Sequence, residues 1–130
     1  SNDNDKIPKP LYDYMPDLNR SKDWRRIGMG LLEHTIDFGA ENGTAKIYRI
    51  AAGTAVPVHT HEGNEVSLVL AGGFTDETGS YGPGDISIQE IGAVHKPVAD
   101  LDEECIVLAV NEGPIRMTGP IGKILNLLIN

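Results

Sequence analysis

Short apolar runs with a period of two residues dominate the chain from residue 24 onward. The segment LLEHTIDF, residues 31–38, places one set of side chains on one face of an extended chain, Leu32, His34, Ile36 and Phe38, and the alternate set on the other, Glu33, Thr35 and Asp37. Such alternation predicts a half-buried β-strand. The Asn42-Gly43 pair that follows is a hairpin signal, and residues 45–51 predict the returning strand.

Further strands are predicted at short, even spacing along the rest of the chain. They fall at residues 66–72, 73–76, 80–85, 86–90, 95–98 and 105–110, with turn signals at 77–79, 83–85 and 111–114. Helical periodicity is absent before IGKILNLLIN, residues 121–130, which we expect to form a short helix. The predicted fold class is therefore all-β and antiparallel, as in a sandwich, a barrel or a double-sheet jelly roll.

The first twenty residues have a different composition. Pro8, Pro10 and Pro16 stand among Asn, Asp and Lys, a mixture that resists both helix and sheet. We interpret residues 1–20 as a tag-cleavage scar and a linker, and residues 21–130 as one domain. A chain of 130 residues with 40% apolar content suffices for one hydrophobic core.

Charge and cysteine content narrow the classes of partner. The formal net charge of −8 opposes binding to nucleic acid or to an anionic membrane surface. No apolar run approaches the roughly 20 residues of a membrane span. Cys105 is the sole cysteine, so no internal disulfide can form, and we expect a cytoplasmic protein.

Candidate chemistry is concentrated in GTAVPVHTHEGNEVSLVLAG, residues 53–72. His59 and His61 are two residues apart, so an extended chain points both imidazoles to the same side. A turn lets Glu65 reach back toward them, and His95 lies about one hairpin further along. Three imidazoles and one carboxylate suit zinc, iron, manganese, nickel or copper better than calcium or magnesium.

The same residues resemble the two motifs of the cupin superfamily. The similarity to the first motif covers every defining position: Gly53, five residues, His59-x-His61, three residues, Glu65, six residues and Gly72. The similarity to the second motif covers Gly84, five residues, Glu90, Gly92, two residues and His95. Two positions differ from the family, because Glu90 stands where Pro is usual and Ala99 stands where Asn is frequent. The resemblance implies a double-stranded β-helix, or jelly-roll barrel. The alternative is a cupin that has lost its metal, which the presence of all four donors disfavours.

Residues 24–128 resemble most closely the cupin-like domain of ChrR-type anti-sigma factors. In that family the domain follows a small helical zinc domain that binds an extracytoplasmic-function sigma factor, and zinc is held at the positions matching His59, His61, Glu65 and His95. The His-x-x-x-Cys-x-x-Cys pattern of the helical zinc domain does not occur here. The sequence is therefore either part of a longer protein or a free-standing relative, and the sigma factor is a partner only in the first case.

Two classes of function follow from the resemblance. The favoured one is a metal-binding sensory domain that detects a small ligand in an oxidative, singlet-oxygen type stress response, with zinc as the favoured metal and iron, manganese or nickel as alternatives. The other is a mononuclear metalloenzyme, a dioxygenase, hydrolase or isomerase. No catalytic residue is proposed, and the enzyme is the less favoured of the two classes. A homodimer is possible, since an edge strand invites pairing.

Four other residues leave two interpretations open. We interpret His34 as a satisfied buried histidine rather than a support for a metal ligand, and Cys105 as a small apolar residue rather than a redox sensor. Tyr48 and Arg49 fall on opposite faces of their strand, so only one of them can point at the pocket.

Overall fold

The computed structural model describes residues 6–36, 44–57, 59–61, 63–111 and 115–117, and for residues 44, 59–61 and 115–117 it describes the backbone alone. The predicted hairpin turn at Asn42-Gly43 and the predicted helix at residues 121–130 lie outside these ranges. Among the described residues, no helix is long and apolar enough to cross a bilayer.

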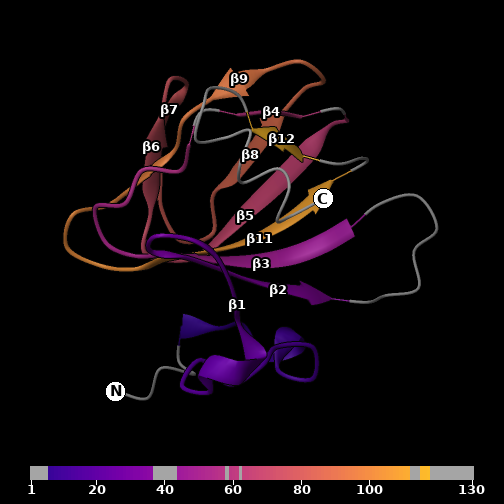
Figure 1. Ribbon diagram of the computed structural model, residues 1–130, viewed down its shortest axis with the longest axis vertical. Coiled ribbons are helices and arrows are strands. Elements are labelled where there is room, and N and C mark those ends of the chain that lie inside the picture. Colours follow the sequence, from indigo (N-terminus) through magenta and orange to yellow (C-terminus); the bar gives the residue numbers. More distant parts are fainter. Residues whose placement is uncertain (1–5, 37–43, 58, 62, 112–114, 118–130) are drawn as a thin grey trace.

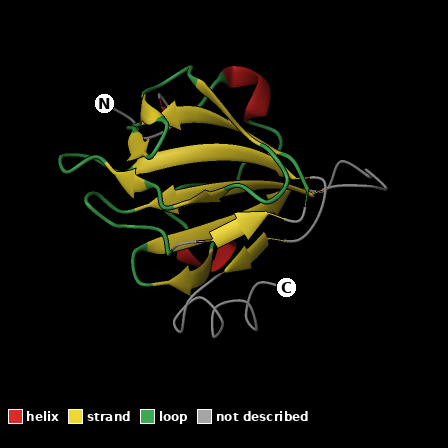
Figure 2. Ribbon diagram, turned by 90° about the horizontal axis from the view of Figure 1, so that it is seen from above, coloured by secondary structure: helices red, strands yellow, loops and turns green. Residues whose placement is uncertain are grey.

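Strands make up most of the described chain (Figures 1 and 2), as the alternating sequence pattern predicts. The strands are β1 Arg25–Gly28, β2 Leu31–Ile36, β3 Thr44–Ile50, β4 His59–His61, β5 Glu65–Ala71, β6 Phe74–Asp76, β7 Gly79–Tyr81, β8 Ile86–Gln89, β9 Val94–His95, β10 Val98–Ala99, β11 Cys105–Asn111 and β12 Ile115–Met117. Short 3-10 helices precede them, among them η2 Lys9–Leu11 and η3 Ser21–Asp23.

Three antiparallel sheets contain all of these strands. The largest has six strands in the order β1-β2-β3-β11-β5-β8, and the two small ones have the orders β10-β6-β7 and β12-β4-β9. In Figure 1 the two small sheets lie above the large sheet and the N-terminal segment lies below it. The all-β prediction is confirmed, and the long β11 joins strands that are far apart in sequence.

The large sheet has a hydrophobic cluster on each face, because the alternating side chains of its strands are divided between the two. The outer cluster joins Ile47 and Ile106, both fully buried, to side chains of the N-terminal segment. The inner cluster joins Ile50 and Val107 to Phe74 of the small β10-β6-β7 sheet. The inner face therefore forms the wall of the barrel interior.

Residues 7–24 pack on the outer face, which the linker interpretation of residues 1–20 did not anticipate. Ile7 and Leu18 are 6% and 7% exposed, and both belong to the outer cluster. Trp24 is also buried and lies under the Arg49 guanidinium, whose carbon is 5.0 Å from the ring centroid. Arg49 also donates to the Leu18 carbonyl over 2.7 Å and to both carboxylate oxygens of Glu104. Apolar residues spaced widely among prolines can thus anchor a segment without forming a regular element.

Glu33 lies on the polar face of the predicted half-buried strand, but the structure buries it. The residue is 2% exposed, because this face of β2 is turned into the barrel. Lys46 Nζ lies 3.3 Å from Glu33 Oε2 and Arg25 lies 3.7 Å from Oε1, so the buried carboxylate is paired with two cations. A strand that is covered on both faces can therefore carry a charged residue at a buried position if a residue of opposite charge lies beside it.

Gly72, the last position of the first cupin-like motif, is required by the backbone. Its φ is +66°, and a Cβ atom there would collide with the Glu104 carbonyl oxygen. Glycine satisfies both conditions, because it adopts a positive φ without strain and has no Cβ atom. The motif glycine thus lets β5 end closely against the start of β11.

We expect Leu18→Ala to lower the free energy of unfolding by about 2 to 5 kcal/mol, because it leaves a cavity in the outer cluster. Leu101→Ala is the matched control, since Leu101 is 88% exposed and its truncation should change stability by less than about 0.5 kcal/mol. Urea unfolding of both variants measures the difference. Equal, small effects would restore the interpretation of residues 1–20 as an unattached linker.

Candidate metal centre

His95 lies opposite the His59-Thr60-His61 strand. It ends β9, which pairs antiparallel with β4 in a register that places His59 opposite His95 and Thr60 opposite Val94. Directly opposed residues of an antiparallel pair have Cβ atoms roughly 5 Å apart. The structure thus brings the backbones of two predicted ligands, 36 positions apart in sequence, into direct register. The side chains of His59 and His61 lie outside the described atoms, and their role as ligands stays a prediction.

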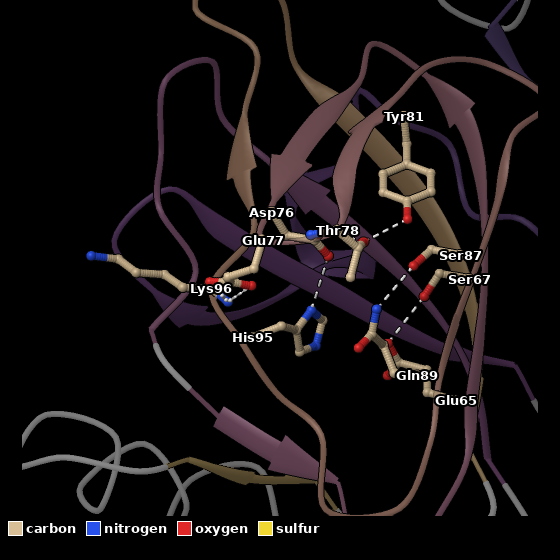
Figure 3. Close-up of polar contacts among 10 residues, drawn as sticks. All are labelled: Glu65, Ser67, Asp76, Glu77, Thr78, Tyr81, Ser87, Gln89, His95 and Lys96. Carbon is tan, nitrogen blue, oxygen red and sulfur yellow. Dashed lines mark hydrogen bonds and ion pairs between the residues drawn. The ribbon is translucent and has the colours of Figure 1, made fainter.

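Glu65 begins β5 and points to the inner face of the large sheet. It lies opposite Gln89 of β8 and Asn111 of β11, and its side chain is buried, with 6% of the residue exposed. The Ser67 hydroxyl group donates a hydrogen bond of 3.0 Å to Glu65 Oε1 (Figure 3). Beside this pair, Gln89 Nε2 donates to Ser87 Oγ over 3.2 Å. Neighbouring strands therefore fix the position of the carboxylate.

Glu65 and His95 line one cavity of about 80 Å³ inside the barrel. Tyr48, Ser67 and Ser87 are the other polar residues of its wall, and the remainder is apolar, with Leu31, Ile50, Phe74 and Val107 among the contributors. The predicted convergence of Glu65 and His95 is thus supported by their common cavity. Of the pair Tyr48 and Arg49, it is Tyr48 that faces the interior.

Burial changes the acid–base properties of both residues. It raises the pKa of Glu65 to about 7, although hydrogen bonds from Ser67 and Asn111 act in the opposite direction. Burial also lowers the pKa of His95, and the nearby carboxylates of Asp76 and Glu77 only partly offset this effect. Near neutral pH the site therefore offers a neutral imidazole and a carboxyl group that a cation would readily ionise.

Asp76, at the end of β6, holds the far side of the His95 ring. Its Oδ2 atom lies 3.5 Å from His95 Nδ1, and in the view of Figure 3 the ring lies between Asp76 and the Glu65–Ser67 pair. Thr78 donates to Asp76 Oδ1 from its backbone nitrogen over 2.8 Å and from its hydroxyl group over 2.6 Å. Burial raises the pKa of Asp76, but the Thr78 hydrogen bonds and the contact with His95 outweigh that effect and leave it lowered.

This arrangement fits a metal ion. A carboxylate on Nδ1 of a histidine orients the ring and leaves Nε2 for a metal, which is the usual support of an imidazole ligand. A buried carboxyl group with a raised pKa gains most from a cation beside it. Sequence reasoning missed Asp76, because nothing in the segment GFTD indicates that β6 would pass behind His95.

His34 and Cys105, the two remaining candidate residues, do not line the cavity. His34 is on the outer face, where its Nδ1 atom lies 3.2 Å from the Asp23 carbonyl oxygen and its ring meets Trp24 edge-on. That placement supports the interpretation of His34 as a satisfied histidine. Cys105 is fully buried, and burial, together with nearby acidic residues, raises the pKa of its thiol to about 12, as suits an apolar packing residue.

Comparison with known proteins places this geometry in a family. Residues 19–116 match the family model of the ChrR cupin-like domain. The chain is 38% identical over 119 residues to the anti-sigma-E factor ChrR of Cereibacter sphaeroides, an alignment that covers 92% of this chain and 55% of ChrR. The chain thus spans little more than half the length of that relative.

Solved structures agree with the match. ChrR in the crystal structure of Rhodobacter sphaeroides SigE in complex with the anti-sigma ChrR superposes with a TM-score of 0.71 and 40% identity, over 82% of this chain and 57% of that chain. An acetylacetone dioxygenase from Acinetobacter johnsonii gives a TM-score of 0.66 at 13% identity, over 85% of this chain and 89% of that chain, and at that identity shows the fold alone. The predicted cupin jelly roll is confirmed, and the chain belongs to the ChrR cupin-like domain family.

Proposed function

We propose that this chain is the metal-holding sensory domain of a ChrR-like anti-sigma factor, with one divalent transition-metal ion bound by His59, His61, Glu65 and His95. The observation that carries the proposal is the shared cavity of Glu65 and His95, together with the register that sets His59 opposite His95. Family membership raises the same expectation independently.

Zinc is the favoured ion, with iron, manganese or nickel as alternatives. Four donors of this kind fill a tetrahedral zinc shell, as in structural or sensing sites. An octahedral iron or manganese ion with the same donors would keep open positions and would favour the alternative, a metalloenzyme acting on a small molecule. A bound ion would supply positive charge to the cavity, where Ser67 and Asp76 already orient Glu65 and His95.

The regulatory partner in this proposal is an extracytoplasmic-function sigma factor. The basis is the relative whose structure is a complex of SigE with the anti-sigma ChrR. Because the chain spans only part of that relative, we assign the sigma contact to a longer protein and the sensing of an oxidative signal to this domain. The net charge of −8 fits a role without direct DNA contact, in the cytoplasm.

Metal content is the first test of the site. Protein purified without added metal should contain about one zinc ion per chain by elemental analysis, and Glu65→Gln and His95→Ala should reduce that content severalfold or more. His34→Ala is the matched control, because His34 lies on the outer face and should leave the metal content unchanged. Full metal content in His95→Ala would exclude His95 as a ligand.

Asp76→Asn tests the support of His95 rather than the donor set itself. We expect about 10- to 100-fold weaker metal affinity, because the oriented carboxylate behind the imidazole is lost while all four donors remain. Competition with a coloured chelator measures the affinity. Glu77→Gln is a control on the adjacent residue, whose carboxylate accepts hydrogen bonds from the Lys96 backbone nitrogen and does not bond to the ring. Equal affinities for the two variants would contradict the positioning role of Asp76.

Sigma-dependent transcription tests the regulatory output in the full-length protein. We expect Glu65→Gln or His95→Ala to abolish most of the induction of a sigma-dependent reporter by photosensitiser and light, while repression in the dark persists. His34→Ala should retain normal induction. Wild-type induction in metal-depleted Glu65→Gln would disprove the sensory role of the site, while a metal-bearing protein that turns over a small substrate would support the enzyme alternative.

A further inference from the structure

Tyr48 contributes a polar group to the cavity that the proposed metal set does not use. It lies on the inner face of β3, opposite Glu33 on β2 and Val107 on β11, and lines the same cavity as Glu65 and His95. The described part of the chain supplies no hydrogen bond to its hydroxyl group. Tyr48 is half-buried, and a tyrosine hydroxyl group that lines a largely apolar cavity is suited to donate to a bound molecule.

Ser87 offers a second donor on the neighbouring wall. Its hydroxyl oxygen accepts a hydrogen bond from Gln89 Nε2, which leaves its own proton without an acceptor among the residues that the structure describes. Ser67, by contrast, already donates to Glu65. Two O–H donors, from β3 and β8, thus line a space whose remaining wall is largely hydrocarbon. Such a wall selects a ligand with acceptor oxygens and an apolar body.

Charge balance limits the ligand to a single negative charge. A divalent ion with the Glu65 carboxylate and neutral imidazoles would have a net charge of about +1, and the Asp76 carboxylate behind His95 lowers the positive charge of the surroundings further. A monoanion is therefore the most negative ligand that this site accommodates, whereas a dianion would leave an excess buried negative charge. Without the ion, the Glu65 carboxylate would repel an anionic ligand, so this inference rests on the proposed function.

The size of the cavity limits the apolar part of the ligand. Its volume of about 80 Å³ corresponds to about five water molecules at roughly 15 Å³ each. Leu31, Ile50 and Phe74 contribute to the wall, where a short hydrocarbon chain would be removed from water. A longer chain would not fit without displacing these side chains.

We propose that the cavity binds a small monoanion with a short apolar tail, of the class of short-chain carboxylates, and that the Tyr48 hydroxyl group donates a hydrogen bond to its oxygen. Tyr48 then determines specificity for an acceptor oxygen, and the apolar wall determines specificity for tail length. The phenol remains protonated for this task, because burial, with added repulsion from the Glu33 and Glu65 carboxylates, raises its pKa.

Sodium butyrate is the probe, titrated into the metal-loaded chain and followed by amide chemical shifts. We expect Tyr48→Phe to weaken butyrate binding about tenfold, as the loss of a hydrogen bond to a charged acceptor does, with unchanged metal content. Tyr12→Phe is the matched control, because Tyr12 is 46% exposed on the N-terminal segment and should bind butyrate like wild type. In wild type, butyrate should bind about tenfold more tightly than acetate, since two further methylenes are buried.

Three results would overturn the inference. They are equal butyrate affinity in Tyr48→Phe and wild type, no butyrate binding by a chain with one ion bound, and equal binding of butyrate and its neutral amide, butyramide. If Tyr48→Phe does not fold, Ser87→Ala, expected to lose about threefold, and the acid–amide comparison in wild type decide the question. Elemental analysis separates the two proposals, because a chain without the ion overturns the proposed function, whereas a metal-bearing chain that ignores butyrate overturns this inference alone.

Discussion

The burial of a carboxyl group beside an imidazole, in a cavity with a mostly apolar wall, is the constraint on which the rest of the site depends. Glu65 and His95 are each 6% exposed, and burial shifts the pKa of each toward its neutral form. Removing such groups from water is unfavourable unless a partner compensates. Ser67 and Asn111 on one side and Asp76 on the other contribute to this compensation, and the proposed cation would add to it.

The two-faced sheet makes this burial possible. Its inner face can carry Glu65, Ser67, Ser87 and Gln89 because the apolar residues that stabilise the fold are distributed between two clusters rather than one. The outer cluster, with Ile47 and Ile106 at its centre, depends on the N-terminal segment as a cover. The outer side of the sheet thus contributes packing, while the inner side combines packing with the candidate site, so the N-terminal segment stabilises a sheet that carries the site on its other face.

The sequence predicted well the features that depend on local spacing. Period-two alternation identified the strands, and His59-x-His61 with Glu65 and His95 matched the cupin motifs before any pairing was known. It failed where the answer depends on which segments meet. The burial of Glu33 depends on Lys46 and Arg25 from neighbouring strands, and the contact of Asp76 with His95 joins two strands of different sheets. Neither residue has a local pattern that would distinguish it from a surface carboxylate.

The packing of the N-terminal segment was not anticipated for a related reason. Proline-rich composition correctly excluded long helices and strands, but it does not report whether scattered apolar side chains find a surface to cover. Ile7 and Leu18 are eleven positions apart and have no shared period, yet both reach the same cluster. The outer face of the sheet determines where these side chains pack, and that face exists only once β3, β11 and β5 have paired.

The connections of His95 favour a regulatory use of the site over a purely structural one. Through Asp76 and Thr78 the ring is linked to the turn of the β6–β7 hairpin, where Thr78 also bonds the Tyr81 hydroxyl group over 2.7 Å. Phe74 begins the same hairpin, stacks on Tyr81 and forms part of the cavity wall. An occupant of the cavity therefore meets this hairpin at two points, through the imidazole and through the phenyl ring. A closed structural metal site needs no such coupling, whereas a sensor must transmit occupancy to the surface, and this hairpin is the element through which it could do so.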